Sequence, residues 1–170
     1  MRFAGSTVVI TGAAGGLGSA MVSGFAAEGA QVVGLNCDRG PQTMMPLMAG
    51  IREKVDCAIA AQPVPYHTDA AAPTMQALRS ETTQRAFPLA LEPFGCTRFE
   101  MAQFALQARD LGVDYVGICC GAGPHHVRAM AEALGREVPA SKYSPSIDLH
   151  PMFREHVSAK DAMFLKTWNA

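Results

Sequence analysis

Two adjacent cysteines, Cys119 and Cys120, are the residues of this chain whose chemistry is hardest to explain by packing alone. They close an apolar, β-branched run, residues 113–118, which has the length and composition of a buried parallel strand. Residues 121–124 predict a turn, and a helix is expected to begin at His125. The thiols should therefore lie at the carboxyl end of a strand, where parallel α/β proteins bind ligands. Because free cysteine also serves as a small buried hydrophobe, a packing role and a chemical role both stay open here.

The composition is that of an ordinary globular domain. The chain has 170 residues, a formal net charge of -1 and 49% hydrophobic residues. This charge gives no electrostatic case for nucleic acid or an anionic membrane surface, and the apolar stretches are interrupted well before about 18 residues accumulate. The first residues lack the pattern of a signal peptide, so we expect a cytoplasmic protein. Its five cysteines are then expected to be reduced thiols that are available to a metal.

A glycine-rich turn lies near the start of the chain. A short β-branched run, residues 7–10, precedes it, and a helical stretch, residues 19–28, follows it. The next predicted strand, residues 31–36, completes a βαβ unit. The turn contains Gly12, Gly16 and Gly18. Their spacing resembles the dinucleotide-binding turn of short-chain dehydrogenases/reductases, and Asp38 stands where that family often places a ribose-binding acid.

The catalytic half of that family's pattern is missing. Its Tyr-x-x-x-Lys motif requires a lysine four residues after a tyrosine. The residues at that offset from the three tyrosines are Ala70, Cys119 and Ile147. A reductase is therefore not expected, and two interpretations of residues 1–38 remain. The glycines and Asp38 either bind NAD(P) in a dehydrogenase remnant, or the glycines only make a tight turn between strand and helix.

A second and longer resemblance covers residues 31–146. The strand end Gly34-Leu35-Asn36-Cys37 and the later Gly117-Ile118-Cys119-Cys120-Gly121 are its most specific motifs. Together they resemble the homocysteine S-methyltransferase family, in particular its bacterial betaine-homocysteine methyltransferase-like members. Further matching stretches are residues 61–66, 91–94, 96–101 and 124–134.

The resemblance implies a zinc site. In that family, a cysteine at the end of one barrel strand and an adjacent pair at the end of a later strand hold zinc, and these positions are Cys37, Cys119 and Cys120 here. Three thiolates suit the borderline softness of zinc and leave a fourth position open. A thiol on zinc is deprotonated, so homocysteine would be presented as a nucleophile. The implied reaction is methyl transfer from a sulfonium or quaternary ammonium donor to homocysteine, giving methionine.

The remaining candidate side chains are expected to have structural roles. Thr97 is a plausible N-cap for a helix over residues 97–111, and Glu100 would complete a capping box. His125 and His126 are expected to have capping or surface roles rather than to bind metal. Two cysteines have no place in the implied site, namely Cys57 and Cys96.

The resemblance also implies a (βα)8 TIM barrel, which normally needs about 250 residues. We therefore expect an α/β fold that is a partial (βα)8 barrel of about four parallel strands, with an open Rossmann-like sheet as the alternative. The predicted segments are a glycine-rich βα unit (1–30), the part-barrel (31–140) and a tail (141–170) that could form a helix over residues 151–168. The strands are expected near Val8, Val32, Ala58 and Val116.

Three functions follow from these observations. The first is a zinc-thiolate homocysteine S-methyltransferase that uses homocysteine and a methyl donor and is truncated, so that activity and inactivity of the chain alone both stay open. The second is an NAD(P)-binding dehydrogenase remnant, and the third is a non-catalytic α/β fragment. The open edges of a partial barrel also predict either a homo-oligomer formed through these edges or an open α/β sandwich.

Overall fold

The computed structural model describes residues 4–6, 10–11, 16–80 and 85–146. Contacts divide the chain into two compact units, residues 1–138 and 139–170. The described part of the second unit contains one 3₁₀ helix, η3 (Pro139–Tyr143). The helix predicted over residues 151–168 lies outside the described residues.

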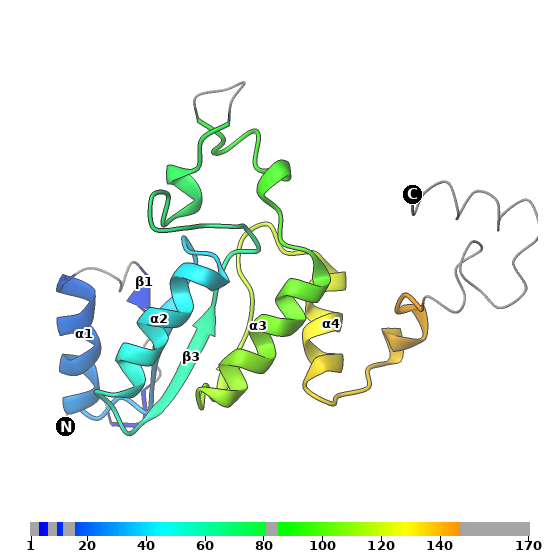
Figure 1. The fold of residues 1–170 in the computed structure, drawn as a ribbon. Helices are drawn as coiled ribbons and strands as arrows, with labels where there is room; N and C mark the ends of the chain where they lie inside the picture. Colours follow the sequence, from blue (N-terminus) through cyan, green and yellow to red (C-terminus); the bar gives the residue numbers. More distant parts are fainter. Residues whose placement is uncertain (1–3, 7–9, 12–15, 81–84, 147–170) are drawn as a thin grey trace, which may run out of the picture. The chain divides into compact units, whose positions relative to one another are not determined.

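Strands and helices alternate along the first unit (Figure 1). The described part of residues 63–97 forms a long connection with two short 3₁₀ helices. Within the described ranges, no helix is long and apolar enough to cross a membrane. The elements are β1 (Ile10–Thr11), α1 (Gly16–Ala27), β2 (Val32–Asn36), α2 (Pro41–Arg52), β3 (Ala58–Gln62), η1 (Met75–Ala77), η2 (Glu92–Phe94), α3 (Arg98–Asp110), β4 (Tyr115–Val116) and α4 (Pro124–Ala133).

The four strands form one parallel sheet in the order β1-β2-β3-β4. This confirms the predicted α/β class with a parallel sheet. Each strand pairs with its neighbour in the sequence, whereas a doubly wound sheet reverses its strand order at a switch point. Because all the strands run in one direction, their carboxyl ends lie at one edge of the sheet, and so do the loops that follow them.

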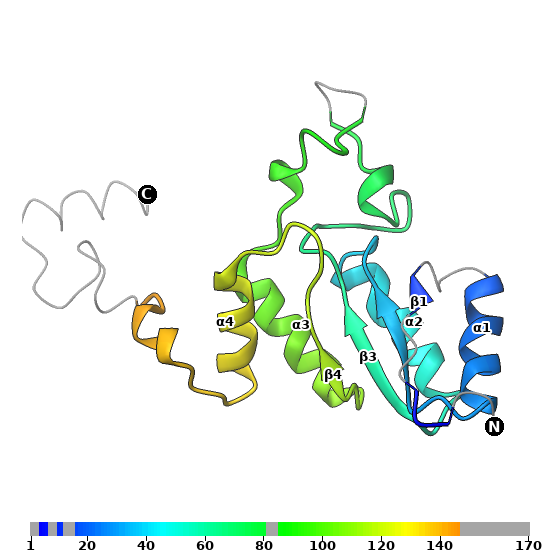
Figure 2. The same cartoon turned by 180° about the vertical axis from the view of Figure 1, so that it is seen from behind.

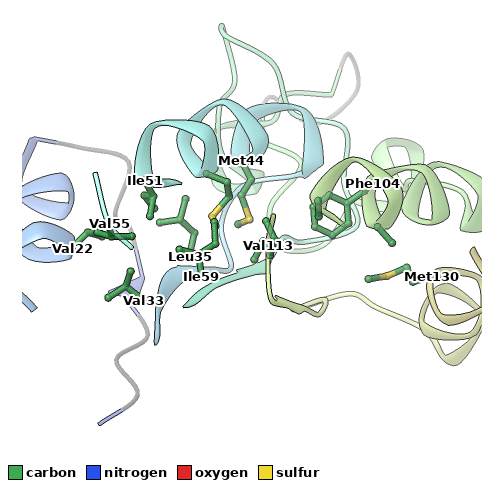
Figure 3. Close-up of a cluster of buried hydrophobic side chains, with 14 of the residues drawn as sticks. Val22, Val33, Leu35, Met44, Ile51, Val55, Ile59, Phe104, Val113 and Met130 are labelled. Atoms are coloured by element: carbon green, nitrogen blue, oxygen red, sulfur yellow. The ribbon is translucent and has the colours of Figure 1, made fainter. Parts of the chain in front are cut away.

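The main core lies between the sheet and its covering helices. Val33, Leu35 and Ile59 alternate with residues of the opposite face, as the period of two in a strand requires. Met44 of α2 and Phe104 of α3 pack into the same cluster (Figure 3). Seen from behind, β2 and β3 lie in front of α2 (Figure 2). This packing fixes β2 and β3, whose ends carry part of the site described below.

Two predicted boundaries need correction. The helix expected to begin at residue 19 begins at Gly16. The strand expected over residues 113–118 is reduced to Tyr115–Val116, although Gly117 N–H still donates to Ala61 O (2.9 Å). The strand stops early because its partner continues into Pro63, which has no N–H to return to the ladder.

Candidate functional site

The three cysteines singled out by the family resemblance lie together at the carboxyl edge of the sheet. Cys37 directly follows β2, and Cys119 and Cys120 lie in the loop after β4. The Cys120 Sγ lies 3.6 Å from the Cys37 Sγ and 3.7 Å from the Cys119 Sγ. All three sulfurs lie within 4.8 Å of one another. All three cysteines are free thiols, since a disulfide bond would need about 2.05 Å between sulfurs.

Cys37 owes its position to an unusual backbone conformation. Cys37 and Asp38 have φ values of 68° and 62°, the only positive φ angles of non-glycine residues in the described ranges. This left-handed region costs an L-residue about 1–2 kcal/mol. Tertiary hydrogen bonds hold it: Cys37 N–H donates to Gln62 O (2.9 Å), and Val64 N–H donates to Arg39 O (2.9 Å). Such strain persists where the surroundings over-determine the conformation, which is common at functional sites.

The Cys119–Cys120 pair is anchored to the end of β3. Cys119 N–H donates to Pro63 O (2.8 Å), and Ala122 N–H closes a turn onto Cys119 O (3.2 Å). Gly121 has φ +88°, and a Cβ there would lie 2.2 Å from the Tyr66 Oη. The tyrosine ring therefore packs directly on the glycine next to the cysteine pair. Burial, followed by the charges of Glu92 and Cys120, raises the pKa of Tyr66, which keeps its hydroxyl protonated.

The electrostatics at Cys119 favour a neutral thiol in the absence of a cation. Burial, followed by the hydrogen bond with the Cys37 side chain, raises the pKa of Cys119 to about 12. Cys37 and Cys119 are half-buried and Cys120 is exposed, so the cluster is reachable from solvent. Three thiolates at these separations would repel one another, and a divalent cation is what could hold them together.

Of the four residues in the dinucleotide-binding alternative, the structure describes three. Gly12 lies outside the described residues, whereas Gly16 and Gly18 lie in the first turn of α1. The Asp38 carboxylate accepts a hydrogen bond from Gln76 Nε2 (2.7 Å). Its backbone carbonyl accepts another from Met75 N–H (2.8 Å). Asp38 thus ties the end of β2 to η1.

A second cluster of metal-ligand side chains was not predicted from the sequence. His67, Cys96 and Glu100 each offer a donor atom within 4.8 Å of the other two. No spacing motif signals this group, because His67 lies after β3 and Glu100 lies in α3, far apart in the sequence. The predicted capping box is confirmed: Glu100 N–H donates to Thr97 Oγ1 (3.2 Å), and the Glu100 carboxylate accepts from Thr97 N–H (2.7 Å).

The His126 side chain bonds to two backbone groups: the N–H of Gly123, in the turn after the cysteine pair, and the carbonyl of Cys96, in the second cluster. Its Nδ1 accepts a hydrogen bond from Gly123 N–H (3.0 Å), so its Nε2 carries the proton and donates to Cys96 O (3.0 Å). The predicted capping role is confirmed for His126. A surface role is wrong for it, because the residue is only 6% exposed.

Comparisons with known proteins point to one family of methyltransferases. The sequence model described as homocysteine S-methyltransferase matches residues 7–134, which includes the glycine-rich unit. Betaine–homocysteine S-methyltransferase 1 of Danio rerio is 39% identical over 114 residues, 64% of this chain and 27% of the relative. The protein of the same name from Mus musculus is 33% identical over 135 residues, 72% of this chain and 32% of the relative. S-methylmethionine–homocysteine S-methyltransferase of Pongo abelii is 32% identical over 135 residues, 72% of this chain and 36% of the relative. The chain thus spans between a quarter and two fifths of the length of these relatives.

Proposed function

Because this chain belongs to the homocysteine S-methyltransferase family, we propose that Cys37, Cys119 and Cys120 hold a zinc ion that activates homocysteine for methyl transfer. The observation that carries the proposal is the spacing of the three sulfurs. Two sulfurs that each lie 2.3 Å from a tetrahedral zinc are about 3.8 Å apart. The Cys37–Cys120 and Cys119–Cys120 sulfur separations, 3.6 and 3.7 Å, are close to this value.

The residues around the thiols support catalysis rather than a closed structural site. Three cysteines supply three ligands, which leaves a fourth tetrahedral position for a substrate sulfur. Bound zinc would supply the positive charge that keeps the ligands and an incoming thiol deprotonated. The strained backbone at Cys37 and the bond from Cys119 N–H to Pro63 O hold two of the sulfurs in place before binding. Because Cys120 is exposed, the substrate can approach from solvent.

We propose further that β1–β4 are consecutive strands of a (βα)8 barrel. Their parallel pairing in sequence order supports this, since barrel strands pair with their sequence neighbours. The chain spans only part of its relatives. The family resemblance implies that most of the groups for the methyl donor and for the amino-acid end of homocysteine belong to the remainder of the barrel. Methionine formation and the methyl donor therefore remain proposals for the complete catalytic unit. Cytoplasmic localisation stays an expectation.

Self-association is part of this proposal. The strands β1 and β4 are the two edges of the sheet, and a parallel edge exposes unpaired backbone groups unless another segment covers it. A second copy of the chain or the remainder of a barrel would satisfy them. Size-exclusion chromatography with light scattering is expected to show a dimer or larger species. A stable monomer across a range of concentrations would contradict self-association.

No contact among the described residues specifically favours NAD(P) binding. The family match includes the glycine-rich unit from residue 7 onward, and Asp38 already accepts a hydrogen bond from Gln76. A melting-temperature shift with NAD(P)H would revive this alternative. A protein that binds neither zinc nor NAD(P)H would be the non-catalytic fragment.

The test of the zinc proposal is the metal content of protein purified without chelator. The parent chain is compared with a Cys119→Ser/Cys120→Ser variant and with Cys57→Ser as a matched control. Zinc at the three-cysteine site should be present in the parent and the control and lost from the double variant. Binding of homocysteine to the zinc form is then measured by calorimetry. A folded parent whose zinc content equals that of the double variant would refute the proposal.

A further inference from the structure

The segment after β3 and the segment before α3 pair in a way that brings two potential ligands side by side. Tyr66 and Gly95 form an antiparallel bridge. His67 N–H donates to Phe94 O (2.7 Å), and Cys96 N–H donates to Pro65 O (2.9 Å). These two bonds fix the backbones of His67 and Cys96 on two facing segments. The main-chain positions of both residues are therefore set before any ligand binds, and only their side chains need to rotate.

Glu100 completes the group from the first turn of α3. Its Oε2 accepts hydrogen bonds from Thr97 N–H (2.7 Å) and Thr97 Oγ1 (2.9 Å). Its Oε1 lies 2.7 Å from the His67 Nε2. One carboxylate oxygen thus holds the helix cap while the other points to the imidazole. The second oxygen can bind a cation without breaking the cap.

We propose that His67, Cys96 and Glu100 form a second metal site, for a borderline divalent cation such as zinc or cobalt(II). Imidazole, thiolate and carboxylate are all zinc ligands, with bonds of about 2.0–2.3 Å. The three donor atoms lie within 4.8 Å of one another, a span that one ion can bridge after small side-chain rotations. Binding replaces the hydrogen bond between His67 Nε2 and Glu100 Oε1 with two metal bonds, and the Nε2 proton is exchanged through water for a proton on Nδ1, so the imidazole stays neutral. The Cys96 S–H bond breaks as the sulfur–metal bond forms, and the proton leaves to water.

The surroundings provide access and a fourth position. Cys96 and Glu100 line a cavity of about 430 Å³ between α2 and α3, which Gln42 and Gln103 also line. Water can reach the ion from this cavity and complete a tetrahedral set. Because Cys96 is buried, the cation must displace a firmly held proton, so this site is expected to bind more weakly than the three-cysteine site.

Occupancy would stiffen a segment that reaches the three-cysteine cluster. Tyr66 precedes His67, and its ring packs on Gly121 beside Cys120. A metal that joins His67 to α3 would hold this ring in place. The second site would therefore have a structural role, distinct from methyl transfer.

The test uses the full chain with Cys37, Cys119 and Cys120 replaced by serine, which removes the first site. Titration with cobalt(II) is followed by near-ultraviolet thiolate-to-cobalt absorption, and circular dichroism verifies folding. We expect about one cobalt per chain. Adding Cys96→Ala should abolish the absorption, whereas Cys57→Ala, the matched control, should leave it unchanged. Failure of the zinc proposal would not affect this result, because the first site is absent.

Two milder variants test the other ligands without disturbing the core. The His67 side chain is 40% exposed, and His67→Ala should weaken cobalt binding about 10-fold or more. Glu100→Gln keeps a capping acceptor but removes the charge, and it should also weaken binding. A folded triple variant without cobalt–thiolate absorption would overturn the proposal. So would absorption that persists unchanged in the His67 and Glu100 variants.

Discussion

Replacing Gly121 with alanine should destabilise the fold and disturb the three-cysteine cluster. The glycine has φ +88°, a conformation that costs an L-residue about 1–2 kcal/mol, partly offset by the lower entropy of the unfolded chain. The new Cβ would also lie 2.2 Å from Tyr66 Oη and 2.7 Å from its Cζ. Relieving such overpacking typically costs about 1–3 kcal/mol more. Because Cys120 is the preceding residue, zinc content should fall together with stability.

Gly135 provides the matched control. It also has positive φ, +76°, but a Cβ there would meet nothing within 4 Å. Gly135→Ala should therefore show only the backbone cost, about 1 kcal/mol, and should retain zinc. Urea unfolding of the metal-free proteins measures stability, and metal analysis measures zinc. Adding Tyr66→Ala to Gly121→Ala should remove the clash and restore part of the zinc binding. Equal destabilisation by the two glycine substitutions, with zinc retained in both, would refute the reasoning.

Three further predictions concern α3, the helix to which Glu100 of the second cluster belongs. Phe104→Ala should cost about 3–5 kcal/mol because its side chain is fully buried, whereas Phe99→Ala, 69% exposed, should change stability by less than about 0.5 kcal/mol in urea unfolding. Equal losses would contradict this. Thr97→Ala should cost about 1 kcal/mol through the lost cap, and Thr74→Ala, an N-cap without a side-chain bond, should cost less in the same assay. Similar values for both would show that the capping bond contributes little. The hydrogen bond from the Thr97 backbone, followed by that of the neighbouring imidazole, lowers the pKa of Glu100 from 4.5 to about 2. The contribution of the Glu100 carboxylate to the free energy of unfolding should therefore be complete above about pH 4.5 and lost as the pH falls toward 2. Unfolding curves at several pH values should show this loss in the parent and not in Glu100→Gln.

Local sequence patterns determined much of the first unit. The β-branched run that ends at Asn36 predicted β2, and the Thr97–Glu100 pair predicted both the start of α3 and its capping box. These features depend on residues that are close in the chain, so local conformational preferences decide them. The family resemblance likewise identified the three cysteines from short motifs.

Long-range contacts decided the rest. The left-handed conformation of Cys37 depends on hydrogen bonds to the end of β3, and β4 is short because Pro63 cannot complete its pairing. The cluster of His67, Cys96 and Glu100 exists only because two segments separated by a long loop form an antiparallel bridge. No pattern in the chain encodes these distances directly. The sequence by itself therefore specified which side chains could bind metal, and the tertiary structure decided which of them meet, because only packing of the sheet and its loops brings distant segments within bonding range.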